Sequence, residues 1–286
     1  MKGWLITHKN CLDGATAALV AQQCGLTPVF VEPDQAEQAL LAIADSNPIY
    51  FADVSLKRSS WRQWQNRITY ILDHHQSALP LCGLPGVTID QSRSGGHLMY
   101  DFAVLEMGMK PTASWNRLCL AVERYDLWKP GHGEGEDLNR LFHRLGYEWY
   151  ARRFGSGFVP FTSAEADLLA QLVREEARLV RTHLANAVPY QKRLSYPLYA
   201  LQLADEGLLN AISHTLIEQG AGLVLVVKPD GRVSVRTDNR VDAAALMEAL
   251  FAGGGHARAA GGRLSSSHAT DLLDLLQSIE SYLLKI

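Results

Sequence analysis

The chain has 286 residues, of which 47% are hydrophobic and 20% are charged, and these proportions are ordinary for a soluble globular protein. The formal net charge of −3 argues against a broad electrostatic surface for duplex nucleic acid, but it leaves room for a small anionic ligand. No apolar run approaches the roughly 20 residues that span a bilayer, no secretory signal is visible, and the four cysteines form no C-x-x-C pair. We therefore expect a cytoplasmic protein without a membrane partner, a disulfide framework or a structural zinc site.

Short apolar runs alternate with helical patterns in the first 130 residues. The predicted strands lie near residues 3–7, 29–31, 48–52, 68–72 and 87–89, and the predicted helices lie near 14–21, 35–44, 56–65 and 95–107. Alternation of this kind implies βαβ units and a parallel sheet, and hence an α/β fold. Two further helices are predicted at 112–124 and 136–153.

The remaining chain begins with a long, polar-faced helix at 163–186, for which Thr162 or Ser163 is the expected cap. Strands are predicted at 199–203, 222–227 and 232–237, and a closing helix at 269–284. The pair Asp230-Gly231 between the last two strands is a strong hairpin signal. We predict three parts: a parallel-sheet domain at 1–130, a helical connector at 131–190, and a smaller α/β domain with a mixed sheet at 191–286.

Three predicted strands stop at side chains of types that bind metals. The side chains that follow the strands at 3–7, 48–52 and 68–72 are, in chain order, His8, Asp13, Asp53, Asp73, His74 and His75. Open α/β sheets bind ligands at the carboxyl ends of their strands, so we expect these groups to meet along one edge. Carboxylate and imidazole suit Mn²⁺, and the absence of paired thiolates disfavours a closed zinc site. The sequence therefore predicts a metal site on the parallel sheet.

A second signal is the segment GGGHARAAGG at residues 253–262. Glycines let backbone N–H groups approach an anion closely, and a helix beginning nearby would add its positive end. His256 and Arg258 supply donors and charge suited to phosphate oxygens. The residues of this segment that we expect to contact a phosphate are Gly254, Gly255, His256 and Arg258. Arg236, on the preceding predicted strand, is a further candidate, although an exposed arginine is commonplace.

These motifs, in this order, resemble the DHH phosphoesterase superfamily, in the branch that joins a DHH domain to a DHH-associated C-terminal domain. The segments that carry the resemblance are His8 to Asp13, Ala52-Asp53-Val54-Ser55, Asp73-His74-His75, Asp126 within residues 123–128, and the glycine segment. They cover nearly the whole chain, and they imply a catalytic metal-binding domain at 1–130 and a substrate-binding domain at 191–286. Members of this branch include short-RNA exonucleases, single-strand-specific exonucleases, and phosphodiesterases that act on cyclic dinucleotides or their linear products.

The resemblance also implies a role for each ligand-type residue. His8 would bind the first metal, Asp13 the second, and Asp53 both. His74 and Asp126 would complete the shell of the second metal. Members of the family typically use two manganese ions, and such a pair activates water and stabilises the attacking and leaving oxygens of phosphoester hydrolysis. We therefore expect two Mn²⁺ ions, with Mg²⁺, Zn²⁺ and Fe²⁺ left open.

The resemblance places His75 facing the scissile phosphate. The sequence departs from the family pattern at one position. The common first motif has a histidine followed by two carboxylates spaced by one residue, and here Cys11 stands in place of the first carboxylate. Either Cys11 ligates the first metal through its thiolate, which would favour softer ions such as zinc or iron, or that site is weaker and completed by water. A third alternative is that Cys11 is a small buried hydrophobe.

Simpler alternatives exist for the other positions as well. His97 is expected to be a helix-start residue rather than a substrate contact. For the candidate ligands, the alternatives are a turn cap at Asp73, satisfied interior histidines at 74 and 75, and a surface carboxylate at Asp126. The number of ligand-type positions in family order favours the metal site over these alternatives.

The expected activity is hydrolysis of di- or very short oligoribonucleotides, such as pGpG, to nucleoside monophosphates, by an oligoribonuclease of the 3′–5′ exoribonuclease type. A cleft holding one phosphate at the metals and a neighbouring nucleotide at the glycine segment would favour short substrates. The extended basic groove with stacking aromatics that long single strands use is not apparent. Three alternatives stay open: a cyclic-dinucleotide phosphodiesterase, a nucleotide 3′-phosphatase and a non-catalytic nucleotide-binding module. Homodimer formation and cleavage polarity are open as well.

Overall fold

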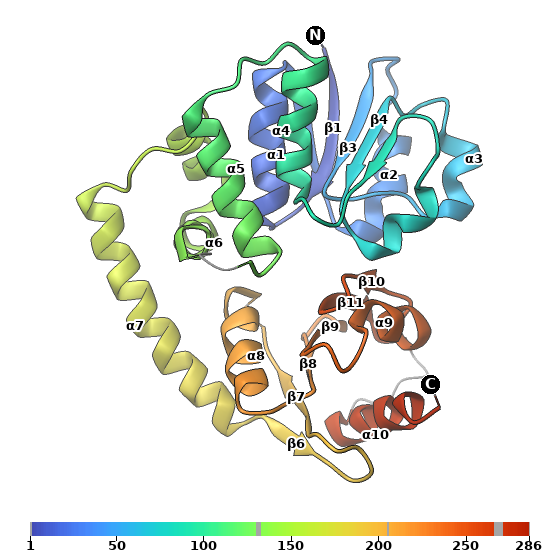
Figure 1. The fold of residues 1–286 in the computed structure, drawn as a ribbon, viewed down its shortest axis with the longest axis vertical. Helices are drawn as coiled ribbons and strands as arrows, with labels where there is room; N and C mark the ends of the chain where they lie inside the picture. The colour runs from blue at the N-terminus through green and yellow to red at the C-terminus, as the bar shows by residue number, and fades with distance from the viewer. Residues whose placement is uncertain (1, 130–132, 205, 266–270, 286) are drawn as a thin grey trace. The chain divides into compact units, whose positions relative to one another are not determined.

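The computed structural model describes residues 2–129, 133–204, 206–265 and 271–285, and the chain divides into two compact units, Met1–Leu169 and Ala170–Ile286 (Figure 1). Each unit has its own sheet and its own hydrophobic clusters. The predicted domain boundary between residues 130 and 131 lies outside the described residues. Among the helices that are described, none combines the length and the apolar character that crossing a membrane requires.

The first unit is built around a five-stranded sheet in which neighbouring strands are parallel. Its strands are β1 (Gly3–His8), β2 (Leu26–Val31), β3 (Ile49–Ala52), β4 (Tyr70–Asp73) and β5 (Val87–Ile89). Their spatial order is β2-β1-β3-β4-β5, so the chain changes direction across the sheet between β1 and β3. Doubly wound sheets bind their ligands at the carboxyl ends of the strands at such a point.

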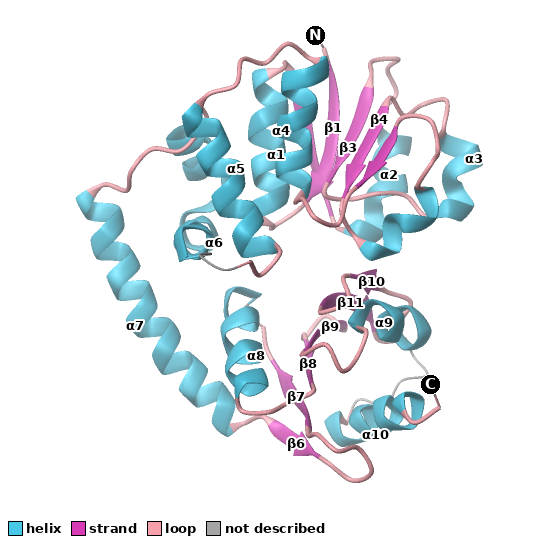
Figure 2. Ribbon diagram, viewed as in Figure 1, coloured by secondary structure: helices cyan, strands magenta, loops and turns pink. Residues whose placement is uncertain are grey.

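Helices cover both faces of this sheet (Figure 2). On one face lie α1 (Leu12–Gln23), α4 (Gly95–Glu106), α5 (Ala113–Asp126) and α6 (Gly133–Phe154), and on the other lie α2 (Ala36–Ala42) and α3 (Trp61–Trp64). Successive strand residues point to opposite faces, so Leu5 belongs to the cluster under the first group of helices and Ile6 to the cluster under the second. Burial on both faces explains why the strands are almost continuously apolar.

The second unit contains a six-stranded mixed sheet in the order β10-β11-β9-β8-β7-β6. Its strands are β6 (Val188–Tyr190), β7 (Leu198–Gln202), β8 (Leu223–Val227), β9 (Arg232–Thr237), β10 (Gly254–Gly255) and β11 (Ala259–Arg263). β7 and β8 are parallel, whereas the other neighbouring strands in the described part of this unit are antiparallel. Its helices are α8 (Leu209–Glu218), α9 (Ala243–Phe251) and α10 (Leu272–Leu283), and α7 (Ser163–Ala185) begins in the first unit and ends in the second.

The predicted α/β class, with a parallel sheet followed by a mixed sheet, is confirmed. The hairpin predicted at Asp230-Gly231 joins β8 to β9, with Gly231 at φ +80° and Lys228 N donating to Arg232 O at 2.8 Å. The helix predicted at 56–65 is wrong in its first part, because Leu56 is buried on an irregular segment and the regular helix begins only at Trp61. Residues 269 and 270 of the predicted closing helix lie outside the described residues.

The described residues also form short 3₁₀ helices: η1 (Pro33–Gln35), η2 (Arg58–Ser60), η3 (Gln76–Leu81) and η4 (Glu206–Leu208). The strand predicted at 68–72 begins two residues later, at Tyr70, and ends at Asp73. This shift leaves the end of the strand, and the histidines that follow it, at the edge where the prediction placed them.

Candidate metal centre

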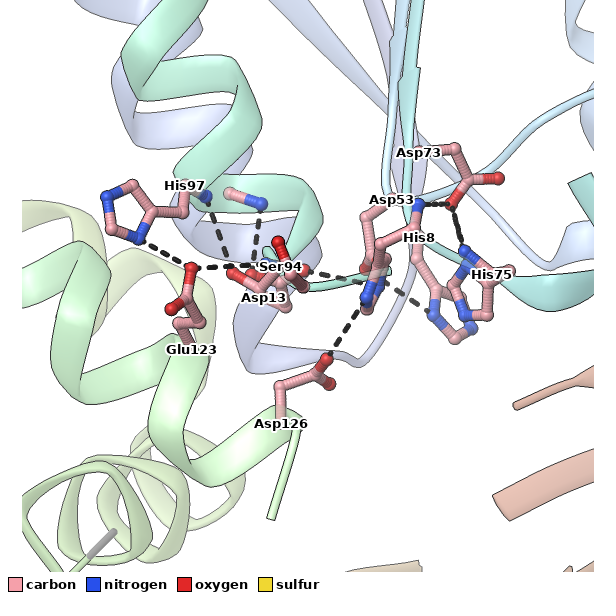
Figure 3. A network of polar contacts seen from close by, with 12 residues as sticks. His8, Asp13, Asp53, Asp73, His75, Ser94, His97, Glu123 and Asp126 are labelled. Carbon is pink, nitrogen blue, oxygen red and sulfur yellow. Dashed lines mark hydrogen bonds and ion pairs between the residues drawn. The ribbon is translucent and has the colours of Figure 1, made fainter. Parts of the chain in front are cut away.

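The carboxyl ends of three neighbouring strands carry the candidate ligands. His8 is the last residue of β1, Asp53 directly follows β3, and His74 directly follows β4. β1 pairs with β3 and β3 pairs with β4, all in parallel, so the three strand ends lie next to one another. Figure 3 shows the side chains of His8, Asp13 and Asp53 turned toward a common region at this edge.

His74 lies at the centre of the cluster. Its Nε2 is 3.1 Å from Asp53 Oδ1 and 3.7 Å from Asp13 Oδ2. Its Nδ1 is 3.7 Å from Asp126 Oδ2, and His8 Nδ1 is 3.7 Å from Asp53 Oδ2. The structure thus brings together five of the predicted site residues, from β1, α1, α5 and the positions that directly follow β3 and β4.

The cluster buries carboxylate oxygens without completing their hydrogen bonds. Asp13 and Asp53 are 1% and 2% exposed. The Oδ2 atom of each is buried and accepts no hydrogen bond from any residue that the structure describes. Buried polar atoms are nearly always satisfied, because an unpaired one loses its hydration without compensation. Two such oxygens, facing a histidine, fit the requirements of a bound cation.

The pKa shifts at the cluster point the same way. Burial and the negative charge of Asp13 raise the pKa of Asp53, although the hydrogen bond to His74 opposes the shift. Burial alone would lower the pKa of His74, but its hydrogen bond to Asp53 and the charges of Asp126, Asp53 and Asp13 outweigh burial and raise it. Both shifts show a buried excess of negative charge. A protonated imidazole offsets part of that excess, and a divalent cation offsets more.

Asp53 is held in an uncommon backbone conformation. Its φ is +60°, in the left-handed region, and its N–H donates to Leu72 O at 3.1 Å. A side chain on Gly95, the first residue of α4, would bring a Cβ within 2.6 Å of Asp53 Cα. The start of α4 therefore packs directly on the Asp53 backbone. Aspartate tolerates this conformation better than most residues, and strain of this kind is concentrated at functional sites.

The first turn of α4 also orients Asp13. Gly96 N donates to Asp13 Oδ1 at 3.0 Å, and a Cβ at Gly96 would approach that oxygen to 2.8 Å. The first N–H groups of a helix carry partial positive charge and favour a carboxylate partner. Because one oxygen of Asp13 is fixed by the helix start, the other is left facing His74.

A buried ion pair supports this helix start, and its residues were not among the predicted site residues. Glu123, on α5, is 3% exposed, and its Oε2 lies 2.7 Å from His97 Nδ1 in the first turn of α4. Lys129 Nζ donates to Glu123 Oε1 at 2.8 Å. Burial raises the pKa of Glu123, but His97 and Lys129 outweigh burial and bring it to about 2. The available signal was the spacing of Glu123 and Asp126, because residues three apart lie on one side of a helix.

The side chains of the DHH tripeptide have two different roles in the structure. Asp73 is 1% exposed, and its Oδ1 accepts the His74 N–H at 2.7 Å and lies 2.7 Å from His75 Nδ1. Burial raises the pKa of Asp73, but the adjacent His75 outweighs burial, and the net shift is downward. The carboxylate therefore fixes the ring of His75 through Nδ1. The His75 side chain is 25% exposed, so the edge of its ring opposite Nδ1 can contact a ligand.

Cys11 lies beside the cluster, at the position that immediately precedes α1. His8, Cys11 and Asp53 each offer one ligand atom, and these atoms all lie within 4.8 Å of one another. Asp13, Asp53 and His74 form a second group by the same criterion. Burial and the charges of Asp53, Asp126 and Asp13 raise the pKa of the Cys11 thiol. The edge of the sheet thus holds two candidate metal-binding groups, and Asp53 belongs to both.

The glycine segment of the second unit forms a tight hairpin between β10 and β11. The N–H of His256 donates to Ala259 O at 2.8 Å, within the turn. A Cβ at Gly253 would lie 1.9 Å from Gly261 O, so the close approach of these backbones itself requires glycine. The segment is preceded by α9, whose first N–H group, on Ala243, donates to Ala257 O at 2.8 Å. These backbone donors serve the hairpin, so an anion here would be bound mainly by side chains.

Two arginines selected from the sequence lie on or beside this hairpin. The guanidinium of Arg236, on β9, donates from Nε and Nη2 to Asn210 Oδ1 on α8, at 3.1 Å and 3.0 Å. Arg258 lies at the turn with an exposed side chain, and its carbonyl accepts the Thr237 N–H at 3.0 Å. Arg236 is therefore held in place by a neighbouring helix, whereas Arg258 extends from the turn.

One family model and several solved structures are similar to this chain. Residues 200–283 match the family model of the DHHA1 domain. The DHH domain of a member of the s1p family of ribosomal proteins superposes with a TM-score of 0.67 at 13% identity, covering 100% of this chain and 87% of that chain. The exonuclease RecJ bound to manganese gives a TM-score of 0.57 at 17% identity, covering 100% and 90%. None of the curated protein sequences compared with the chain matches it.

RecJ from Thermus thermophilus, in complex with Mn²⁺, gives a TM-score of 0.58 at 15% identity. The alignment covers 100% of this chain and 52% of that protein, so the chain spans about half of its length. At these identities the likeness shows a shared fold. The DHHA1 match and this shared fold together confirm the resemblance to the DHH superfamily, in the branch that carries a DHH-associated domain.

Proposed function

We propose that this protein is a metal-dependent phosphodiesterase that hydrolyses di- or very short oligoribonucleotides, such as pGpG, to nucleoside monophosphates. The observation that carries the proposal is the sharing of Asp53 between two groups of candidate ligands at the carboxyl edge of the parallel sheet. A carboxylate common to two groups is the arrangement expected of a two-metal hydrolase. The phosphoesterase fold and a relative described as an exonuclease support this class of reaction.

The proposed ligands are His8, Asp13, Asp53, His74 and Asp126. Their donors are imidazole nitrogens and carboxylate oxygens, which suit Mn²⁺ and Mg²⁺. Two bound ions would lower the pKa of a water and stabilise the charge that develops on the phosphate. The protein contributes the geometry: it fixes Asp13 through Gly96 N and seats Asp53 under the start of α4.

His75 is the proposed contact to the scissile phosphate. Its Nδ1 is held by Asp73, whose charge outweighs burial and raises the pKa of His75, so the protonated ring presents the Nε2–H donor in one orientation. A donor fixed in advance contributes more to a transition state than one that must be ordered during the reaction. We assign His75 to a non-bridging phosphate oxygen, and Asp73 to positioning His75.

In the second unit, His256, Arg258 and Arg236 are the proposed contacts to the rest of the substrate, together with the backbone at Gly254 and Gly255. Two arginines and a histidine suit a phosphate or a nucleobase edge. The net charge of −3 favours a short substrate, since the binding of long single strands generally uses an extended basic groove.

The test is product analysis on a panel of linear di- to decaribonucleotides and cyclic dinucleotides with MnCl₂, resolved by chromatography. We expect linear dinucleotides to be turned over fastest and to yield two mononucleotides, and turnover to stop in EDTA. Turnover of cyclic dinucleotides alone, or release of inorganic phosphate without mononucleotide pairs, would replace the proposed substrate. Binding of dinucleotides without manganese-dependent turnover of any substrate would contradict the enzymatic assignment.

A further inference from the structure

The two candidate groups at the sheet edge differ in their chemistry. Asp13, Asp53 and His74 offer two carboxylate oxygens and one imidazole nitrogen. His8, Cys11 and Asp53 offer one nitrogen, one sulfur and one oxygen. Thiolate is a soft ligand that selects zinc, iron and similar ions, whereas carboxylate-rich sites suit manganese and magnesium. The two groups would therefore select different metals.

Cys11 differs from the cysteines that fill the core. Cys119 is fully buried within the main cluster of the first unit, and Cys24 packs against the same cluster. Cys11 is only partly buried and is not a member of any hydrophobic cluster among the described residues. Packing of a small hydrophobe therefore explains Cys119 but not Cys11.

A second observation at the same place points to a cation. Asp53 is 2% exposed, and its Oδ2 accepts no hydrogen bond from the residues described, although it lies 3.7 Å from His8 Nδ1. That separation is long for a hydrogen bond, but it is close to the roughly 3.5 Å between two ligand atoms with bonds of about 2.0–2.2 Å to one tetrahedral ion. The buried oxygen thus faces the group that contains Cys11.

We propose that Cys11 is a thiolate ligand of the site formed with His8 and Asp53, and that this site takes a thiophilic divalent ion such as Zn²⁺, Fe²⁺ or Co²⁺. The group of Asp13, Asp53 and His74 takes a harder ion such as Mn²⁺, so the centre holds two unlike metals joined by Asp53. The inference rests on the proposed function for the assignment of these residues to a metal centre. Binding breaks the Cys11 S–H bond, forms a sulfur–metal bond and releases one proton to solvent.

The experiment is a titration of metal-depleted protein with CoCl₂ under anaerobic conditions, followed by absorption spectroscopy and equilibrium dialysis. The proposal predicts a near-ultraviolet thiolate-to-cobalt charge-transfer band that saturates with one equivalent of cobalt. Cys11→Ser should abolish the band. Cys82→Ser is the matched control, because Cys82 is exposed, and it should leave the band unchanged.

A second variant tests the metal preference. Cys11→Asp replaces sulfur by oxygen, and it should bind Mn²⁺ at least roughly ten-fold more tightly at this site while losing the cobalt charge-transfer band. It should also release about one proton fewer per bound ion at neutral pH, because the carboxylate is already ionised. Manganese binding is followed by electron paramagnetic resonance, which does not depend on turnover.

The outcomes separate this inference from the proposed function. Cobalt binding without a charge-transfer band in the wild-type protein would overturn the role of Cys11 and leave the proposed metal centre standing. Failure to bind either ion would overturn both. Should neither Cys11 variant fold, alkylation of the wild-type protein decides: Zn²⁺ should protect Cys11 from iodoacetamide, with Cys82 as the internal control, and equal labelling with and without zinc would overturn the proposal.

Discussion

Two buried carboxylates, one in each unit, show how differently the same group is used. Glu280, on α10, is 1% exposed, and it accepts hydrogen bonds from Arg193 N at 2.7 Å and Tyr190 Oη at 3.1 Å. Asp53 is 2% exposed, and one of its oxygens accepts no hydrogen bond from the described part of the chain. Burial therefore does not distinguish the two residues. The two residues differ in whether both carboxylate oxygens accept hydrogen bonds.

The difference has an energetic meaning. A buried carboxylate with donors on both oxygens contributes to the stability of its unit, since breaking such an arrangement exposes unpaired partners. A carboxylate buried beside another carboxylate, as Asp53 is beside Asp13, lowers stability until a cation binds. Glu280 thus belongs to the fold of the second unit, and Asp53 to the proposed chemistry of the first.

The largest expected effect comes from Asp53→Asn, which removes the charge and keeps a residue type that tolerates a positive φ. We expect Mn²⁺ affinity and turnover to fall by more than roughly 100-fold, beyond the effect of residues that only support ligands. Without metal, the free energy of unfolding should stay equal or rise, because a buried charge next to Asp13 is gone. Calorimetric titration with MnCl₂ and urea unfolding in EDTA measure the two effects. Unchanged manganese binding would contradict the shared-ligand role.

Glu280→Gln should show the reverse pattern. Loss of the charged acceptor should lower the free energy of unfolding by about 2 kcal/mol, because hydrogen bonds to charged groups contribute on this scale. Manganese affinity should not change. Urea unfolding of this variant is compared with that of Glu218→Gln, whose exposed carboxylate lies 3.5 Å from Nδ1 of the exposed His214. A fall in manganese affinity in Glu280→Gln would mean that the carboxylate is not purely structural.

Glu123→Gln refines the comparison, because the Glu123 carboxylate is hydrogen-bonded like that of Glu280 but lies next to the candidate metal centre. It weakens the contact to His97 and thereby loosens the helix start that donates to Asp13. We expect roughly ten-fold weaker Mn²⁺ binding, in the range for residues that orient ligands. Glu134→Gln, which alters an ion pair with the exposed Arg117, is the control and should bind manganese normally. Equal manganese affinities in Glu123→Gln and Glu134→Gln would contradict the role of Glu123 in supporting the candidate metal centre.

The smallest effect concerns pH and a further buried carboxylate, Glu165. The hydrogen bond from Arg153 outweighs burial and lowers the pKa of Glu165 from 4.5 to about 2. A depressed pKa stabilises the fold above pH 4.5, and this contribution is lost as the pH falls toward 2. Between pH 5 and pH 3, the wild-type protein should therefore lose more unfolding free energy than Glu165→Gln does, by on the order of 1 kcal/mol. Urea unfolding at each pH measures it, and identical slopes in both proteins would contradict the role of the ion pair.

Local patterns in the sequence were sufficient to predict much of the fold and the strand ends at which the candidate ligands lie. Apolar runs that alternate with helices require a parallel sheet, and a parallel sheet places His8, Asp53 and His74 at one edge whatever the details of packing. The hairpin at Asp230-Gly231 was predictable for a similar reason, because glycine at a positive φ is a local requirement. The helices α8 and α9 were not predicted, and the order of strands β10 and β11 in the sheet depends on pairing between distant segments.

Only the tertiary structure decided how the candidate ligands are held. Gly96 and Asp13 are 83 residues apart, and the hydrogen bond between them depends on the packing of α4 against α1. The pair of Glu123 and His97 depends likewise on the packing of α4 against α5. A residue's type and its neighbours in sequence determine which chemistry it can offer and which end of a strand it occupies. Which oxygen of a carboxylate is satisfied, and which is left for a cation, is determined by contacts between segments that no local pattern encodes.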